Sequence, residues 1–411
     1  MSGWALALQL LVLPAVLLSL VEAAYLPLAL VAHARRPADP LRVPSNPFVS
    51  VVVPAFDEGR VLRRCVDSIL ADRYLNKEVV LVDDGSRDDT WEVMKSYRGR
   101  PGVVVAHQTN AGKAAALNHG ISLSRGSILM FVDADGVFSG WTIRGMLRGF
   151  DDPRVGAVCG NDAPVNLDRF QPRLLTLLTH VTAMVRRALA QVNCLTIVSG
   201  NCGAVRREVL DEVGGFTEGL LGEDLELTWR VRRAGYRVSF QPEAIVYAEV
   251  PAGVGPLWRQ RVRWARGYLQ TLWMHRDLVG SVRHGVVGPY LAVNALTMVV
   301  APVLQLVALG IILGLAVDDS QTLYGTPAST LAWALLLFPV LSVVVSAALN
   351  GSWRDLRFFY VLLVMPVYST VMNAVMVTAI VQQLRRRPSR WNKLERTGVS
   401  SRHGIPDGAR F

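Results

Sequence analysis

The residues best suited to chemistry are carboxylates that follow short β-branched runs. Three such runs end in Pro54-Ala55-Phe56-Asp57-Glu58, in Asp83-Asp84 and in Asp133-Ala134-Asp135. Side chains alternate along an extended segment, so Asp133 and Asp135 point to the same side. Carboxylates gathered at one place repel one another unless a cation or a ligand offsets their charge. A pair with this spacing suits a hard divalent ion, Mg²⁺ or Mn²⁺, which keeps open positions for diphosphate oxygens.

Three further stretches could complete a site of this kind. Lys113 follows Gly112 at the start of a predicted helix, where a cation and the helix N-terminus both favour phosphate. The small residues of Ser199-Gly200-Asn201-Cys202-Gly203 allow a ligand to approach the backbone closely. Glu223 and Asp224 open a helical run. They are either helix-capping acids or a general base that takes a proton from an attacking hydroxyl.

The segment from Trp258 to Tyr268 is basic, aromatic and amphipathic. At helical period Gln260, Arg263 and Trp264 share one face. An arginine can fork onto phosphate, and the ring of a tryptophan offers a face on which a sugar can stack. The same composition also suits a helix that lies in the membrane interface and binds lipid headgroups.

The elements that must position these residues belong to an α/β domain between about Pro47 and Pro251. Short strands alternate there with stretches of helical period, which predicts a doubly wound, mainly parallel sheet. The predicted strands are Val49–Val53, Glu78–Val82, Val103–Ala106, Ile128–Val132 and Val155–Cys159. Ligands of such sheets bind beyond the carboxyl ends of the strands, where the acidic residues lie. The sequence has no GxGxxG after the first strand and no GxxxxGK[ST]. It therefore lacks the motifs that would indicate a nicotinamide-binding protein or a P-loop protein.

The rest of the chain is too apolar for a wholly soluble protein. Charged residues make up 18% of the 411 residues, against about 25% in a typical soluble domain. Leu6 to Val31 predicts a transmembrane anchor within residues 1–36, and the Arg35 and Arg36 that follow place the α/β domain in the cytoplasm. Three apolar blocks predict a C-terminal transmembrane region over residues 285–384, namely Val286–Val317, Leu331–Leu349 and Phe358–Val381.

The positions of the C-terminal arginines indicate whether the third apolar block crosses the membrane. If all three blocks crossed the membrane, the arginines at 385, 386, 387 and 390 would lie outside the cell. We therefore expect two spanning helices, followed by a re-entrant or interfacial element bent at Pro366 and a cytosolic tail over residues 385–411.

The net charge narrows the range of expected partners, and the cysteine pattern indicates the state of the thiols. The formal charge is +10, and the arginines cluster beside the apolar blocks. Lipid headgroups rather than nucleic acid are therefore the expected counterions. The four cysteines show neither a CxxC pair nor zinc spacing, so they are expected to be buried thiols.

Taken in order, these motifs resemble those of membrane-embedded family 2 glycosyltransferases. That family includes hyaluronan, chitin, chitin-oligosaccharide, poly-N-acetylglucosamine and cellulose synthases. The resemblance rests on Asp83-Asp84-Gly-Ser, Asp133-x-Asp135, Gly222-Glu223-Asp224 and Gln260-x-x-Arg263-Trp264, within residues 47–280. It implies an α/β GT-A (Rossmann-like) domain over residues 47–250, amphipathic interface helices over 251–280, and an α-helical transmembrane region.

The resemblance also implies a role for each motif. Asp224, next to Glu223, would be the catalytic base, and Asp135 with Asp133 would bind the metal ion. The nucleotide-sugar donor would be held by Pro54, Phe56, Glu58, Asp83 or Asp84, Lys113 and Asp133. The diphosphate and the acceptor would be held by Gln260, Arg263, Trp264, Ser199 and Gly200. Trp391 and Arg396 resemble a gating segment of hyaluronan synthases, although their spacing and order differ.

The expected function is inverting, metal-dependent transfer from a UDP-sugar, with UDP-N-acetylglucosamine as the expected donor, to a growing polysaccharide. A multi-pass plasma-membrane protein with a cytoplasmic catalytic domain would then extrude the product. Two alternatives stay open. One is transfer of a single sugar to a lipid acceptor, and the other is a membrane transporter with a degenerate nucleotide-binding domain. The sequence does not specify the sugar, the linkage, the chain length or a partner subunit.

Overall fold

The computed structural model describes residues 21, 23–35, 46–318 and 340–387. The predicted gating residues Trp391 and Arg396 and most of the predicted N-terminal anchor lie outside the described residues. The strands are β1 (Val49–Ala55), β2 (Lys77–Asp83), β3 (Val103–His107), β4 (Ile128–Phe131), β5 (Val137–Phe138), β6 (Val155–Pro164), β7 (Gly203–Arg206) and β8 (Arg237–Ala248).

The helices of the sheet domain are α2 (Gly59–Ala71), α3 (Thr90–Lys95), α4 (Lys113–Leu123), α5 (Thr142–Leu147), η1 (Arg148–Phe150), α6 (Phe170–Gln191), α7 (Arg207–Val213) and α8 (Glu223–Arg233). Those that follow are α9 (Val254–Met274), η2 (Val282–His284), α10 (Val287–Ala295), η3 (Leu296–Val300), α11 (Ala301–Asp318), η4 (Trp353–Val364) and α13 (Met365–Leu384). Two shorter apolar helices span Ala23–Ala34 and Val340–Leu349.

The strands form one sheet in the order β3-β2-β1-β4-β7-β6-β8-β5. β1 pairs in parallel with β2 and β4, β2 with β3, and β6 with β8. β7 runs antiparallel to β4 and β6, and β5 runs antiparallel to β8. The predicted α/β class with a mainly parallel sheet is confirmed. The sequence did not reveal β5, β7 or β8; β7, Gly203–Arg206, lacks the continuous β-branched run that marked the predicted strands.

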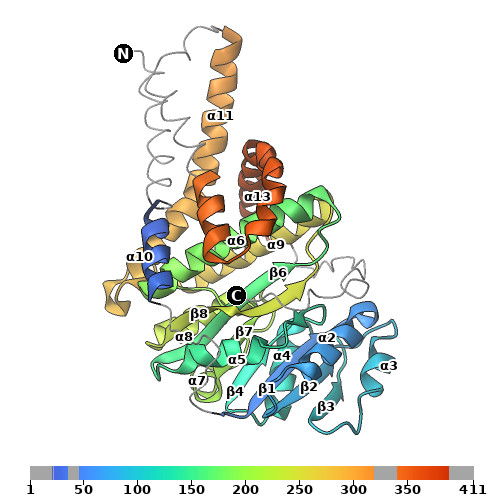
Figure 1. Ribbon diagram of the computed structural model, residues 1–411. Coiled ribbons are helices and arrows are strands. Elements are labelled where there is room, and N and C mark those ends of the chain that lie inside the picture. The colour runs from blue at the N-terminus through green and yellow to red at the C-terminus, as the bar shows by residue number, and fades with distance from the viewer. Residues whose placement is uncertain (1–20, 22, 36–45, 319–339, 388–411) are drawn as a thin grey trace.

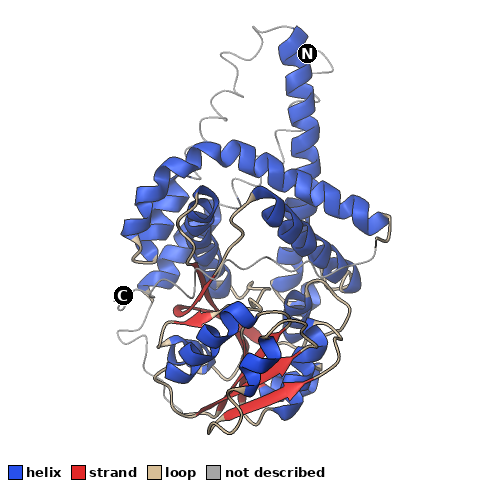
Figure 2. Cartoon of the chain, turned by 90° about the vertical axis from the view of Figure 1, so that its right-hand side faces the viewer, coloured by secondary structure: helices blue, strands red, loops and turns tan. Residues whose placement is uncertain are grey.

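Helices cover both faces of the sheet (Figures 1 and 2). Alternate residues of β1 point to opposite faces of the sheet. Val49, Val51 and Val53 belong to the core that is covered by α2, α3 and α5. Val52 belongs to the core on the other face, which is covered by α4, α7 and α8. Because both faces are buried, the strands appear in the sequence as continuous apolar runs rather than as alternating ones. Each fully buried valine stabilises the fold by about 1.5–3 kcal/mol. All four cysteines are buried free thiols, as expected.

A layer of long helices separates the sheet from the C-terminal helices. In Figure 1, α6 and α9 lie between the sheet and α13. η4 packs against α6, and α13 packs against both α9 and α11. The basic aromatic segment is helix α9, whose buried side chains include Leu257, Val262 and Arg266. Helix α6 was not predicted.

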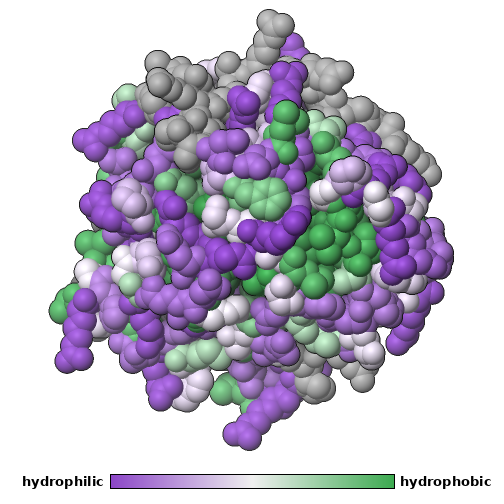
Figure 3. Space-filling model, turned by 90° about the horizontal axis from the view of Figure 1, so that it is seen from below, coloured by the Kyte–Doolittle hydropathy of each residue, from purple (hydrophilic) through white to green (hydrophobic). Residues whose placement is uncertain are grey.

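Two helical segments are long and apolar enough to cross a membrane by length and composition alone. They are Val287–Ile311, with 25 residues, and Trp353–Leu384, with 32 residues. Figure 1 shows α11, in the first segment, pointing away from the sheet. Seen from the sheet end, by contrast, the surface is mostly hydrophilic, with a large hydrophobic area and several smaller ones (Figure 3).

The second apolar segment contacts the helices beside the sheet at both of its ends. Near its start, Asp355 Oδ2 lies 2.9 Å from His180 Nε2 of α6. Just after its end, the Arg387 carbonyl accepts a hydrogen bond of 2.7 Å from Arg266 Nη2 of α9. This arrangement is compatible with the predicted element that turns back without crossing, which stays a prediction.

Candidate active site

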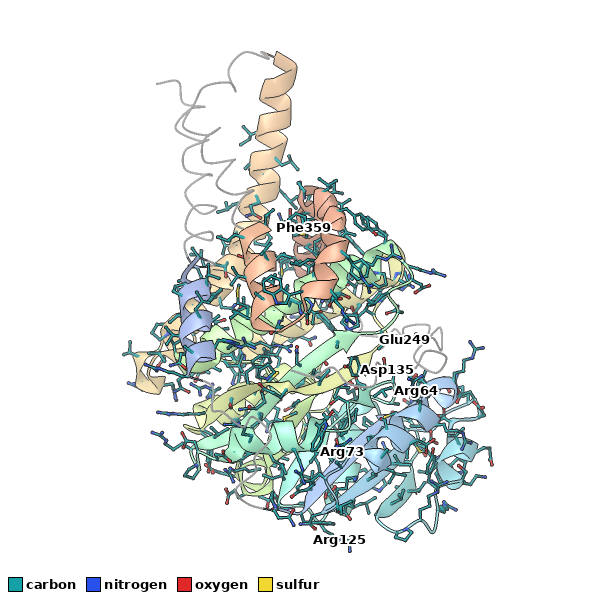
Figure 4. The ribbon with its side chains drawn as sticks, viewed as in Figure 1. Arg64, Arg73, Arg125, Asp135, Glu249 and Phe359 are labelled. Atoms are coloured by element: carbon teal, nitrogen blue, oxygen red, sulfur yellow. The ribbon has the colours of Figure 1, made fainter. Side chains whose placement is uncertain are left out.

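The acidic strand ends meet at one edge of the sheet, as predicted for parallel neighbours. Ala55 of β1 is paired with Asp83 of β2, and β4 runs alongside β1 on its other side. In Figure 4, Arg125, which precedes β4, lies at the far end of the molecule, whereas Asp135, which follows β4, lies toward the helix layer. A cavity of about 2350 Å³ opens at this edge.

The cavity brings together almost all of the predicted site residues. Its lining includes Pro54, Phe56, Glu58, Asp84, Lys113, Asp133, Asp135, Ser199, Gly200, Glu223, Asp224, Gln260, Arg263 and Trp264. Asp83 lies behind the lining: it is fully buried, and its Oδ2 lies 2.6 Å from His107 Nδ1. The structure therefore favours Asp84 over Asp83 as the residue that faces a ligand.

Asp84 shapes the loop that precedes Lys113. Its Oδ1 accepts a hydrogen bond from the Ala111 N–H, and its Oδ2 accepts one from the Gly112 N–H, both at 2.9 Å. Gly112 has φ +93°, in the region that glycine tolerates without strain. The loop enters helix α4 at Lys113 in a fixed direction as a result.

Lys113 lies among the carboxylates. Its Nζ is 2.6 Å from Asp133 Oδ1 and 3.4 Å from Glu223 Oε1. Burial lowers the pKa of Lys113, but the charges of Asp133, Glu223 and Asp224 outweigh this and raise the pKa above its ordinary value. The lysine stays protonated and offsets the repulsion among these carboxylates.

Asp224 has the properties of a general base. The Gly200 N–H donates a hydrogen bond of 3.0 Å to Asp224 Oδ2. Burial and the neighbouring Glu223 charge raise the pKa of Asp224 to about 6, while Lys113 and backbone hydrogen bonds oppose the rise. Such a carboxylate is ionised at neutral pH and still basic enough to take a proton.

Gly200 leaves little room for a side chain next to Asp224. A Cβ atom at Gly200 would lie 3.1 Å from Asp224 Oδ2 and 3.2 Å from Lys113 Nζ. The small-residue stretch thus lies close to Asp224 and Lys113, and the predicted approach of a ligand to its backbone stays a prediction.

Helix α9 touches the start of α8 through two glycines. A Cβ atom at Gly267 would lie 2.8 Å from the Gly222 nitrogen and 2.9 Å from the Leu221 carbonyl carbon. This contact fixes Asp224 of α8 relative to Gln260 and Trp264 of α9.

The α9 residues leave binding groups at the cavity wall. The Trp264 side chain is 47% exposed. Gln260 Oε1 is buried and has no hydrogen-bond partner among the residues that the structure describes. Buried polar atoms without a partner are rare in native proteins, so this oxygen is available to a donor on a ligand inside the cavity.

Asp133 and Asp135 fit a partial metal site. Asp135 is buried, and the Asp133 side chain is 35% exposed while it pairs with Lys113. Within the described residues, no three His, Cys, Asp or Glu side chains come together as a complete metal site. One or two carboxylates, completed by substrate phosphate oxygens, are a common way to bind Mg²⁺. The two aspartates match that pattern.

A partly buried chain of polar contacts that the sequence analysis missed holds Asp133 in place. Asn201 Oδ1 accepts a hydrogen bond of 3.2 Å from the Asp133 N–H, and Asn201 Nδ2 donates one of 3.2 Å to Asp162 Oδ1. Arg186 Nη1 lies 3.5 Å from Asp162 Oδ2. Asp162 follows the predicted strand Val155–Cys159, so inspection of every strand end would have found it. Arg186 lies on α6 and gave no such signal.

Comparison with known proteins identifies the family. Residues 46–267, more than half of the chain, match the model of the family described as "Glycosyltransferase like family 2". The protein belongs to this glycosyltransferase family, and the expected enzyme class is confirmed.

Curated relatives agree with this assignment. Poly-β-1,6-N-acetyl-D-glucosamine synthases from Staphylococcus aureus strain COL and from Staphylococcus epidermidis strain ATCC 35984 are 29% and 28% identical over 222 residues. The aligned part is 53% of this chain and 54% of each relative. The chain thus spans about half the length of the curated relatives it matches.

A solved structure shares the fold. The mannosyltransferase from Pyrobaculum calidifontis, in complex with GDP-Man and Mn²⁺, aligns with a TM-score of 0.63 at 22% identity. The alignment covers 92% of this chain and 99% of that one. The similarity supports the expected GT-A-like fold.

Proposed function

We propose that the protein is an inverting, metal-dependent glycosyltransferase that moves N-acetylglucosamine from UDP-N-acetylglucosamine to the end of a growing polysaccharide. The observation that carries this proposal is one continuous cavity. It is lined by Asp224 and Asp135 at the sheet, by Trp264 on α9, and by residues of α11 and α13 beyond. Membership of the family and the similarity to poly-N-acetylglucosamine synthases support the choice of donor and product.

The donor would lie against the carboxyl edge of the sheet. Its uridine part would be held by Pro54, Phe56, Glu58 and Asp84, and its diphosphate by Lys113 and Arg263. Asp133 and Asp135 would hold Mg²⁺ or Mn²⁺ together with diphosphate oxygens. When bound, such an ion neutralises the charge that develops on the departing diphosphate.

In this proposal, residues of the chain remove the proton of the acceptor hydroxyl and orient the acceptor. Asp224 takes the proton from the acceptor hydroxyl while that oxygen bonds to the anomeric carbon and the bond from this carbon to the diphosphate breaks. Attack from the side opposite to UDP inverts the configuration. Stacking of the acceptor sugar on Trp264 holds the hydroxyl near the base, and such orientation lowers the barrier substantially.

The membrane-side end of the cavity would take the product. Gln305 of α11 and Asn373 of α13 line it, and both helices belong to segments that are apolar and long enough to cross a membrane. This supports association with the membrane. The proposed form is a multi-pass plasma-membrane protein whose catalytic domain is cytoplasmic, with Phe358–Val381 as the re-entrant or interfacial element.

Incubation of purified membranes with radiolabelled UDP-N-acetylglucosamine tests the proposal, with other UDP-sugars screened in parallel. The expected product is a long polymer that stays behind after extraction with organic solvent. A single sugar found wholly in the solvent extract would contradict the polymer and support a lipid acceptor. Failure to incorporate sugar from any UDP-sugar would contradict the proposed activity as a whole.

A further inference from the structure

Arg261 lies on α9 between Gln260 and Arg263, and the chemistry above does not use it. Its guanidinium carbon is 4.3 Å from the centre of the Trp264 ring, inside the range of about 6 Å for a cation–π contact. The side chain lines the cavity. Its Nε is buried and has no hydrogen-bond partner among the described residues. A buried guanidinium is costly, so its place beside the acceptor-side tryptophan calls for an explanation.

Tyr368 holds the guanidinium from the membrane side. It belongs to α13, which packs against α9, and its side chain interacts with Arg261. Burial lowers the pKa of Arg261 and the Tyr368 contact opposes this change, so the group remains a cation. Within the described part of the chain, Arg261 forms no ion pair with a carboxylate. Its contacts are therefore an aromatic face and a hydroxyl.

The guanidinium covers one face of the indole. Trp264 is nevertheless 47% exposed and lines the cavity, so its remaining surface is open to a ligand. Sugars stack on the flat face of an aromatic ring. A ring with one face occupied offers a single stacking surface, and the cation fixes the tilt of that surface.

We propose that Arg261 is a positioning residue for the acceptor: held by Tyr368, it covers one face of Trp264 and leaves the opposite face as the stacking surface for the terminal sugar. This inference rests on the proposed function and extends it. It also couples α13 to the acceptor site through three side chains in contact.

Four variants of the full-length protein test the inference. Arg261→Met keeps the apolar stem and removes the planar cation, whereas Arg261→Lys keeps a cation. Tyr368→Phe removes only the hydroxyl. Arg259→Met is the matched control, because Arg259 lies on the same helix and is exposed. The measurements are KM for the donor, KM and kcat for an N-acetylglucosamine oligosaccharide acceptor, and the Kd of that oligosaccharide by calorimetry.

The expected result is a selective loss on the acceptor side. Arg261→Met should raise the acceptor KM and Kd about fivefold to tenfold, within the range of a cation–π contact, and leave the donor KM unchanged. Arg261→Lys should recover part of this loss. Tyr368→Phe should raise the acceptor KM about twofold, and Arg259→Met should change neither constant.

Several outcomes would overturn the inference. One is an unchanged acceptor KM in Arg261→Met, and another is an equal loss of donor and acceptor affinity. If Arg261→Met does not fold, Tyr368→Phe decides the question, and an unchanged acceptor KM and Kd in that variant refutes the coupling. A wild-type protein that neither binds the oligosaccharide nor transfers sugar from any UDP-sugar removes the proposed function and this inference with it. Turnover in the wild type with unaffected variants removes the inference alone.

Discussion

The two ends of the cavity differ sharply in charge. The sheet with its loops, α4, α6, α8 and α9 contribute charged side chains to its lining, which are Asp57, Glu58, Asp84, Arg87, Lys113, Asp133, Asp135, Asp162, Arg186, Glu223, Asp224, Glu249, Arg261 and Arg263. From α10 to α13, every described lining residue is uncharged, and the polar ones include Asn294, Thr297, Gln305, Tyr368, Thr370 and Asn373.

This difference separates two kinds of ligand chemistry. The proposed nucleoside diphosphate and its counterion would bind at the charged end, where the lining contains both cations and carboxylates. A glycan that bore carboxylates would find no cation among the described residues of the neutral end, and an unpaired charge is costly to desolvate. The neutral end therefore suits an uncharged, hydroxyl-rich and amide-rich chain.

The largest expected effect lies at the charged end. Asp224→Asn removes the proton acceptor and should lower the rate of sugar transfer about 10³-fold, within the usual range for general base catalysis. Initial rates of UDP release and polymer formation measure this change. Asp211→Asn, an exposed aspartate on α7, is the control and should keep full activity. Wild-type rates in Asp224→Asn would rule out the assigned base.

The next effect concerns the metal ion. Asp135→Asn, or treatment of the wild type with a chelator, should lower the transfer rate about 10²-fold, because a bound ion contributes several kcal/mol of charge stabilisation. Addition of Mg²⁺ or Mn²⁺ should restore the chelated wild type but not the variant. A wild type that is fully active after exhaustive chelation would contradict the metal dependence.

The dependence of the transfer rate on pH tests the role of Asp224 at the charged end. Burial and Glu223 raise the pKa of Asp224 to about 6, and the base works only when it has lost its proton. The rate constant kcat/KM for the donor should therefore fall about tenfold for each pH unit below about 6. An ordinary aspartate would place this fall about two units lower. The acidic limb should be missing from the residual activity of Asp224→Asn.

The smallest effect belongs to the neutral end. Asn373 Nδ2 donates a hydrogen bond of 2.8 Å to Gln305 Oε1 and so joins α13 to α11. Asn373→Leu should lower polymer length or yield about twofold to fivefold, since a hydrogen bond of this kind contributes about 1 kcal/mol in a membrane. Gln382→Leu on the same helix is the matched control. If both variants made polymer of normal length, the neutral end would not guide the product.

The charged end could be predicted from the sequence, because local signals mark it. Strands buried on both faces leave continuous apolar runs, and the acidic residues follow those runs directly. The choice between Asp83 and Asp84 was out of reach, because neighbouring residues of a strand point to opposite sides and nothing local says which side faces the ligand.

Long-range contacts set the limit of that prediction. The meeting of Lys113 with Glu223, and the support of Asp133 by Asn201, depend on elements that are distant in sequence. Neither helix α6, which carries Arg186, nor strand β8 was recognised from its sequence pattern. The pair Arg261–Trp264 shares a helix, but the hydroxyl that holds it comes from α13.

The contact between Gly222 and Gly267 has a consequence for the proposed polymer synthesis. The main chains of the two helices touch directly there. The spacing between Asp224 and Trp264 therefore does not depend on the length of a side chain at this contact. Even a single methyl group at Gly267 would have to move a whole helix. In the proposed function, the backbone would therefore set the distance from Asp224 to the acceptor hydroxyl, and this distance would be the same for each added sugar.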